Sequence, residues 1–354
     1  MKNFIKILTN FIFVFGTISL HAQIVNIPDP GFKECFLSQG FDLNKDGEIQ
    51  VSEALEATSL EIKTPIIYEY GINNFIGLEY FSNIKTFTIR AEATYISVDS
   101  LNISNYMPNL ETFTHNESSF KKVDFSNLPK LKSLIMGFDS GRGFEIIGLD
   151  SSNSPNLETM SIYYSNFEEN FDINFAHLQI FTVFQCFFRK NVTISNLPEQ
   201  SYMEDFRNNE MDSLIIDNAS ICDFCAFSSN TINYLSISNS NKFNPLSLYD
   251  SKIKEIELNN LPDLNELNIN GSEITKLRLN NLPMISWLSC GGKGLVDLSI
   301  TNVPNLETLI TTNSKFKNLA LSNLPSLSSL NIEDNSNLEF SYLKNLNALT
   351  TFKA

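Results

Sequence analysis

Four prolines in the last third of the chain recur every 21 residues, and this period constrains the fold more than any other feature. They are Pro262, Pro283, Pro304 and Pro325. The same motif precedes each of the last three: two apolar residues two positions apart, two linking residues, then Leu or Val and the proline. Earlier copies end at Pro129 and Pro198. One such unit is too short to bury its own apolar side, so the copies are expected to stack into a solenoid.

A second apolar segment follows each proline, as in Leu264-x-x-Leu267-x-Ile269. Apolar and polar residues alternate with period two within both segments, which predicts strands and not helices. The hydrophobic fraction of 42% is ample for a core. The expected fold is therefore mostly β, with short strands stacked in parallel.

This pattern resembles leucine-rich repeats, in the short two-strand variety common in exported bacterial proteins. The resemblance covers residues 75–354 and is weakest between 165 and 250, where Phe replaces Leu. It implies an Asn that bonds backbone between turns. The equivalent positions hold Ser272, Lys293, Ser314 and Asn335. Because a lysine cannot make that bond, we expect local irregularity at Lys293.

Residues 42–53 fit the twelve-residue EF-hand loop at every diagnostic position. Calcium prefers six to eight hard oxygen ligands. The predicted ligands are Asp42, Asn44, Asp46, Glu48 through its carbonyl, Gln50 through a water, and Glu53. Gly47 permits the sharp turn, and Ile49 is expected to pack inward. The sequence thus predicts a structural calcium; the alternative is an Asx-rich turn that binds nothing.

The flanks of this loop suggest a small helical cap. Residues 30–37 predict a short helix with Phe32, Cys35 and Phe36 on one side, and a second helix begins at Ser52. The segment resembles the calcium-loop cap that precedes such repeats in exported bacterial proteins. We therefore expect a cap at 23–65 and a leucine-rich-repeat solenoid of about 21-residue units at 66–354, with residues 71–81 as lead-in.

Residues 1–22 have the features of a signal peptide. Lys2 and Lys6 precede an apolar stretch from 7 to 20, and small residues flank a cleavage site after Ala22. An N-terminal anchor helix is the alternative. No later stretch predicts a membrane helix. The expected location is secreted or at the cell surface, with the periplasm as a further option.

The formal net charge of −15 becomes more negative by two once Lys2 and Lys6 are removed. So acidic a surface repels nucleic acid and anionic lipid, and suits calcium, cationic partners or neutral glycans. The five cysteines are scattered and odd in number, unlike a disulfide framework. Cys222 and Cys225 are expected to be a buried pair or a local disulfide, and Cys290 a core residue.

No catalytic set is evident, and we expect that the protein is not an enzyme. The motifs of zinc proteases, serine hydrolases and P-loop nucleotidases are missing. Gly291-Gly292-Lys293-Gly294 lacks the Ser or Thr of a phosphate loop and predicts a turn between strands. The alternative is a polysaccharide-active β-solenoid enzyme.

Residues that flank the inward leucines after each proline must point outward. They predict a ligand face in ladders that comprise Glu266, Asn268, Trp287, Ser289, Thr308 and Asn331. Trp287, the one Trp of the chain, is a suitable binding anchor among polar residues; the alternative is an ordinary surface aromatic. The leading hypothesis is a binding or adhesion protein for a protein or glycan. A structural surface protein without a discrete ligand is the alternative.

The last turn carries Leu343, Leu346, Leu349 and Phe352 without a polar capping element after it. Solenoids usually need such an element. An open apolar edge predicts self-association there, a partner at this end, or a further segment downstream.

Overall fold

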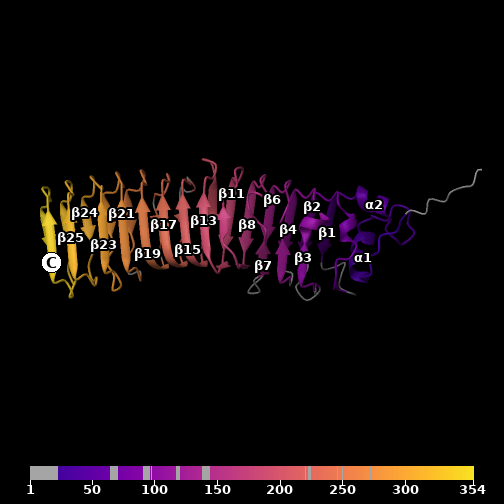
Figure 1. Cartoon of the computed structure of the whole chain (residues 1–354), viewed down its shortest axis with the longest axis horizontal. Helices are drawn as coiled ribbons and strands as arrows, with labels where there is room; N and C mark the ends of the chain where they lie inside the picture. The colour runs from indigo at the N-terminus through magenta and orange to yellow at the C-terminus, as the bar shows by residue number, and fades with distance from the viewer. Residues whose placement is uncertain are drawn as a thin grey trace, which may run out of the picture.

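The computed structural model describes residues 23–63, 71–90, 96, 98–116, 120–137, 144–219, 221, 225–244, 246–248, 250–270 and 273–354. It is a parallel β-solenoid: a straight rod in which short strands run across the long axis, with two small helices at the N-terminal end (Figure 1). The predicted signal peptide, Cys222 and Ser272 lie outside the described residues.

One side of the rod is built from two parallel seven-stranded sheets that continue one another, with β14 next to β16. We call the outward side of these sheets the strand face. The first sheet contains β1 (Ser59–Lys63), β2 (Thr86–Arg90), β4 (Thr112–Asn116), β6 (Ser133–Met136), β8 (Thr159–Tyr163), β11 (Ile180–Phe184) and β14 (Tyr202–Asp205). The second contains β16 (Cys225–Ala226), β18 (Leu246–Ser247), β20 (Glu266–Asn268), β22 (Trp287–Ser289), β24 (Thr308–Ile310), β26 (Ser329–Asn331) and β28 (Thr351–Lys353).

The opposite side is a twelve-stranded sheet followed by a two-stranded one. The larger sheet contains β3 (Ser100–Asn102), β5 (Lys122–Asp124), β7 (Phe144–Ile147), β9 (Ser165–Phe167), β10 (Phe171–Ile173), β12 (Phe187–Phe188), β13 (Asn191–Ser195), β15 (Glu210–Asp217), β17 (Thr231–Ser238), β19 (Lys252–Asn259), β21 (Lys276–Asn280) and β23 (Asp297–Thr301). The smaller pairs β25 (Asn318–Ser322) with β27 (Phe340–Lys344). The predicted two parallel strands per unit are confirmed.

Asparagine makes the corners between the sides. Nine Asn residues before the Leu-Pro motif or its variants have φ between 50° and 60°, a region that few residues other than Gly and Asn adopt easily. They are Asn127, Asn196, Asn218, Asn239, Asn260, Asn281, Asn302, Asn323 and Asn345. Several stack as an exposed amide ladder: Asn281 donates to Asn260 at 2.9 Å, and Asn302 donates to Asn281 at 2.7 Å. The Asn of the repeat motif therefore holds the corner.

A second polar ladder runs inside the turns, at the position predicted for the repeat-family Asn. Asn335 donates to the carbonyls of Thr311 and Ile332 at 2.8 and 2.6 Å. Asn230 likewise donates to Phe206 and Phe227. Lys293 stands at the same position, but its side chain is exposed. The internal ladder is therefore interrupted at Lys293, while β22 and β24 on either side remain in register.

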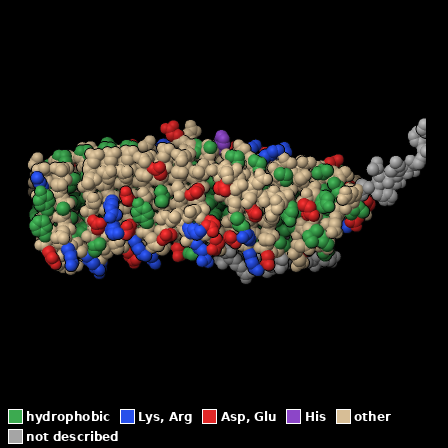
Figure 2. Space-filling model, in the orientation of Figure 1, with side chains coloured by type: hydrophobic (Ala, Val, Ile, Leu, Met, Phe, Trp, Pro, Cys, Tyr) green, Lys and Arg blue, Asp and Glu red, His purple; other side chains and the backbone are tan. Residues whose placement is uncertain are grey.

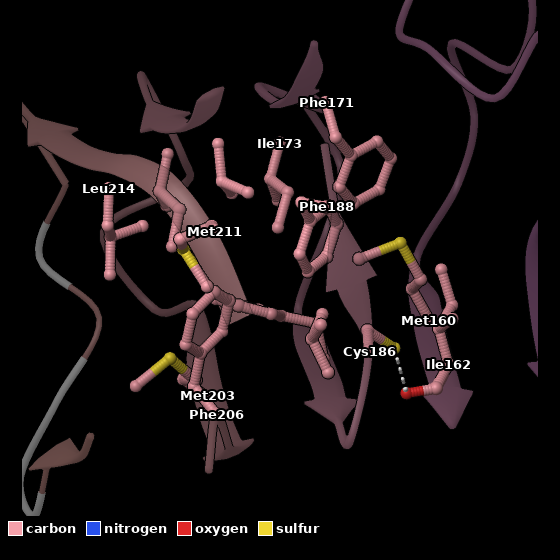
Figure 3. Packing of buried hydrophobic residues seen from close by; sticks show 14 of the residues in the cluster. Met160, Ile162, Phe171, Ile173, Cys186, Phe188, Met203, Phe206, Met211 and Leu214 are labelled. Atoms are coloured by element: carbon pink, nitrogen blue, oxygen red, sulfur yellow. Dashed lines mark hydrogen bonds between the residues drawn. The ribbon is translucent and has the colours of Figure 1, made fainter. Parts of the chain in front are cut away.

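The core is a continuous apolar column between the two sides. In the middle of the rod, phenylalanine and methionine fill the space that leucine fills elsewhere (Figure 3). Phe167 and Phe188 stack with ring centroids 4.6 Å apart. Cys186 packs here with its Sγ 3.7 Å from the carbonyl oxygen of Ile162. Burial raises the pKa of the Cys186 thiol to about 12, so this cysteine is inert core. Cys290, 4% exposed, is also core, as predicted.

Helices α1 (Pro30–Ser38) and α2 (Val51–Glu56) close the N-terminal end of the column. The Asp29 side chain caps α1 by accepting from the Phe32 N–H at 2.9 Å. Phe32, Cys35 and Phe36 are buried as predicted, and the Phe36 ring stacks on Phe81 at 4.1 Å. The short helices η1 (Leu78–Tyr80) and α4 (Ile103–Tyr106) follow. Because β1 already pairs with β2, the strand face begins before residue 66.

The C-terminal end exposes apolar side chains, visible as hydrophobic groups at the left end of Figure 2. Phe340 is 59% exposed and Phe352 is 50% exposed. Both strands that carry them, β27 and β28, pair with only one neighbour among the described residues. Apolar side chains thus remain accessible at this end. No helix of the described part of the chain has the length and hydropathy to cross a membrane.

Candidate functional site

The predicted calcium loop joins α1 to α2 and is organised by its own acidic side chains. The Asp42 carboxylate accepts from the N–H of Gly47 at 2.8 Å and of Asp46 at 3.2 Å. The Asn44 side-chain oxygen accepts from the same Asp46 N–H at 3.0 Å. Oxygens of Asp42 and Asn44 therefore converge on one point. Gly47 has φ 83°, as expected for the sharp turn, and Ile49 is fully buried as predicted.

Asp46 and Gln50 complete the inner lining of the loop. The Asp46 carboxylate accepts from the Glu48 N–H at 2.8 Å and from the Asn44 and Gln50 amides at 2.9 Å each. The Glu48 N–H, followed by the Asn44 amide, holds the pKa of Asp46 below its usual value. Asp46 is consequently a carboxylate at neutral pH and a suitable calcium ligand.

Glu53 bonds to the backbone at both ends of the loop. Its Oε1 accepts from the N–H groups of Leu43 and Asn44 at 2.8 and 3.2 Å, and its Oε2 accepts from the Gln50 N–H at 2.8 Å. This carboxylate thus ties the start of the loop to the start of α2. Within the described ranges, no three His, Cys, Asp or Glu side chains gather as a metal cluster. The donors suit calcium in type and order, and Glu53 must share its oxygens between the backbone and an ion.

The predicted ligand ladder forms on the strand face in the expected register. Glu266 pairs with Trp287, and Trp287 pairs with Thr308. Glu266 and Asn268 are exposed, whereas Trp287, Thr308 and Asn331 are half-buried. The Asn331 amide forms hydrogen bonds with Glu333 of its own turn. Side chains of the ladder therefore lie side by side, and the Asn331 amide is already hydrogen-bonded within the protein.

Ser289 departs from the expectation of an outward-facing hydroxyl. It is only 1% exposed. The Asn270 amide donates to its hydroxyl from the next turn toward the N-terminus and covers it. The physical reason is that Asn270, two residues beyond the end of β20, lies over Ser289. Ser289 is accordingly a buried structural hydroxyl, and it is not available as a ligand group.

The strand face carries further aromatic and apolar side chains that the sequence did not indicate, and we call them the aromatic patch. Ile180 and Tyr202 lie at the start of β11 and β14, and Tyr163, Phe184 and Arg207 lie at the far ends of the strands. Ile180 and Tyr202 are paired neighbours on β11 and β14, exposed by 40% and 46%. Phe184 contacts Tyr163 edge-on, with ring centroids 6.3 Å apart. The guanidinium of Arg207 lies 5.9 Å from the Phe184 centroid.

Arg207 is held in place by a forked ion pair. Its Nε and a terminal nitrogen donate to the two carboxylate oxygens of Asp205 at 2.9 and 2.7 Å. The neighbouring strands present mostly hydroxyls to solvent, such as Thr112, Ser133 and Thr159, which lie in one register. The patch thus combines apolar and aromatic side chains with a fixed ion pair, and the exposed Glu204 carboxylate lies between them and accepts from the Thr182 hydroxyl at 3.2 Å. Such aromatic and arginine side chains dominate the binding energy of protein interfaces.

The repeat pattern is weakest in residues 165–250, so the sequence does not distinguish inward from outward aromatic residues in the aromatic patch. Phe occupies both inward and outward positions there, as in Phe181 and Phe184. Two features could have revealed it: the parity of Phe184 relative to the inward Phe181, and the Asp205-x-Arg207 pair just after a strand.

Comparison with known proteins adds the following. No family model matches the sequence, and neither does any curated protein. Among solved structures, the chain is similar to an internalin from Listeria monocytogenes, at 14% identity and TM-score 0.33 over 95% of this chain and 98% of that one. It is similar to the functional domain of InlJ from the same organism, which includes a cysteine ladder, at 18% identity and TM-score 0.39 over 89% and 74%. YopM from Yersinia enterocolitica shares 14% identity at TM-score 0.26 over 84% and 91%.

The overlaps are too loose to transfer any site. The functional argument therefore rests on the side chains of this chain.

Proposed function

We propose that the protein is an extracytoplasmic binding scaffold, non-catalytic, that recognises a protein partner through its strand face. The observation that carries the proposal is the aromatic patch. Interface hot spots are enriched in Tyr, Trp and Arg that are packed on a rigid base. Parallel strands hold Tyr202 and Phe184 in place, and the Asp205 ion pair holds Arg207, so little side-chain freedom remains to be lost on binding.

The charge distribution supports the same site. The far side of the rod carries ion pairs across its strands, such as Lys276 with Glu255 at 2.7 Å and Arg278 with Asp297 at 3.3 Å. Charged groups on that side must be desolvated before a partner can bind. Exposed ion pairs contribute little free energy to offset this cost. On the strand face, Lys63 and Arg90 pair with Glu61 on β1 and β2, and Arg207 pairs with Asp205. The hydroxyl and aromatic side chains between these pairs have a smaller desolvation penalty.

A pull-down of surface proteins from the native cells, followed by titration of the purified partner, tests this site. Phe184→Ala and Tyr202→Ala should each weaken binding by at least tenfold, because an anchoring aromatic contributes about 2 kcal/mol or more. Tyr234→Ala is the matched control, since Tyr234 lies on β17 of the opposite side and bonds to Glu257. It should leave binding unchanged.

The remaining outcomes separate the alternatives. A loss of binding with Trp287→Ala alone would place the site on the β20–β24 ladder and contradict the patch. Binding to a glycan array in place of a protein would favour the glycan hypothesis. The absence of any saturable partner would favour a structural surface protein, and turnover of a polysaccharide would contradict the non-catalytic role.

We further propose that the loop at 42–53 binds a structural calcium through Asp42, Asn44, Asp46, the Glu48 carbonyl, Gln50 through a water, and Glu53. The converging oxygens of Asp42 and Asn44 and the ionised Asp46 support this. The ion would draw the loop, α1 and α2 together over Phe81 and the first turns. A calcium at extracellular concentration, on the order of 100 times its Kd, would add about 2.7 kcal/mol to the stability of the cap.

Isothermal titration with calcium tests this directly, with magnesium as the comparison ion. Asp42→Asn should abolish the heat of binding without breaking the Glu53 bridge between loop and helix. Glu53→Gln should weaken binding and also destabilise the cap in the presence of a chelator, because three backbone N–H groups then lose a charged acceptor. If calcium produces no heat and leaves the melting curve unchanged, the loop is an Asx-rich turn.

A further inference from the structure

The turn between β22 and β23 lacks the internal polar side chain that Asn209, Asn230, Ser251, Ser314 and Asn335 supply in other described turns. At the equivalent position, Asn209 is 1% exposed, Asn230 is fully buried and Ser251 is 6% exposed. Lys293 takes this position here and is exposed. An ammonium group cannot be buried among backbone groups without a charged partner. The lysine is accordingly at the surface, where it forms part of the lining of a hollow between turns.

Neighbouring turns approach so closely that two of these glycines cannot be replaced. A Cβ on Gly291 would lie 2.2 Å from the carbonyl oxygen of Thr312, and one on Gly294 would lie 2.8 Å from that of Ile274. A hollow of about 730 Å³ lies at the ends of β20, β22 and β24, and Gly291, Gly292 and Gly294 form part of its lining. Its walls also include Asn270, Glu273, Lys293, Thr312 and Asn313. We call this hollow the glycine pocket.

One polar residue of the glycine pocket bonds within the protein, and the others line the rest of the hollow. Asn270 is already used, because its oxygen accepts from the Gly291 N–H at 2.8 Å and its amide donates to Ser289. Lys293, Asn313, Thr312 and Glu273 line the rest of the hollow. The pocket thus contains one cationic residue, Lys293, and one carboxylate residue, Glu273. Thr312 and Asn313 are neutral residues that can both donate and accept hydrogen bonds.

We propose that the glycine pocket binds a sugar acid, a single carboxylated ring. The carboxylate pairs with Lys293 in a charge-assisted hydrogen bond, which is stronger than a neutral one. Ring hydroxyls, which both donate and accept, bond to Asn313, Thr312 and Glu273. The site lies beside the β20–β24 ladder, away from the aromatic patch, and does not depend on the proposed protein partner.

Competing ligands fit the same walls less well. A phosphate carries close to two negative charges at neutral pH and would be repelled by Glu273. A polyanion is opposed by the chain's net charge of −15. A peptide C-terminus brings a side chain that needs an apolar wall, yet no aliphatic or aromatic side chain lines the hollow among the described residues.

Selective ¹⁵N-glycine labelling reads this site directly, because the chain has only 14 glycines. Titration with glucuronate should shift the amide signals of Gly291, Gly292 and Gly294, while glucose, the same ring without the carboxylate, should bind at least tenfold more weakly. Lys293→Gln should reduce glucuronate binding to the level of glucose, and Lys293→Arg should retain it. Lys344→Gln, which removes an exposed lysine on β27, is the control and should bind like the unchanged chain.

A second variant guards against a simple folding defect. Lys293→Asn introduces the residue that Asn209, Asn230 and Asn335 place inside their turns. It should keep the fold, fill the inside of the turn and abolish the glycine amide shifts on titration with glucuronate. Equal binding of N-acetylglycine and glucuronate would show a plain carboxylate site and overturn the sugar assignment. Tighter binding of inorganic phosphate, or no glycine shift with glucuronate, would also overturn it.

Discussion

Replacing His115 with methionine should remove an acid-sensitive term from the stability of the first turns. His115 is 1% exposed and lies on β4 in an apolar column, where it pairs with Ile89 on one side and Met136 on the other. Its ring stacks against Phe113, with centroids 6.4 Å apart. Burial lowers the pKa of His115 from 6.5 to about 4, because the core does not solvate an imidazolium.

The sign and size of the effect of His115 on the unfolding free energy follow from proton linkage. The folded state disfavours the protonated form, so the contribution of His115 to stability is fully present above pH 6.5 and is lost as the pH falls toward 4. At 1.36 kcal/mol per pKa unit, lowering the pH from 7.5 to 5 costs about 2 kcal/mol of unfolding free energy. Methionine fits the same column and carries no titratable group.

Urea unfolding followed by circular dichroism at the two pH values measures this term. The native chain should lose about 2 kcal/mol more than His115→Met between pH 7.5 and 5. His177→Gln is the matched control, because His177 is exposed and its replacement should leave the pH dependence as it is in the native chain. Parallel loss of stability in the native chain and His115→Met would refute the argument that the buried imidazole controls acid sensitivity.

Three other substitutions test the ladders and the end of the rod. Lys293→Asn should raise the free energy of unfolding by about 1 kcal/mol. An Asn at this position can donate to the Cys290 carbonyl, as Asn335 donates to the Ile332 carbonyl. A lower urea midpoint would contradict this. Asn230→Ala should lower the same quantity by about 2 kcal/mol, because it strands the carbonyls of Phe206 and Phe227 and the Asn209 N–H; an unchanged midpoint would show that these bonds are dispensable. If residues 23–354 self-associate through the exposed apolar side chains of β27, Phe340→Lys should shift sedimentation toward the monomer, whereas no change would move the contact elsewhere.

Local pattern alone determined the stacking of this protein. The 21-residue period and the alternation within each segment predict parallel strands, and the Glu266–Trp287–Thr308 ladder lies in the register that this period requires. The inward packing of Ile49 and the buried side of α1 also follow from spacing, because each depends on only a few neighbouring residues. The lysine at position 293 correctly marked where the internal ladder would break.

Contacts between turns were decided by the tertiary structure. Ser289 has the parity of an outward residue, yet Asn270 of an adjacent turn covers it. Glu53 has the spacing of a calcium ligand, yet it bonds to three backbone N–H groups. The aromatic patch forms because three different strands bring Tyr163, Phe184 and Tyr202 to one surface. Periodicity specifies which side of a strand a residue lies on, but exposure and bonding depend on side chains one turn away, which are distant in sequence and adjacent only in the folded rod.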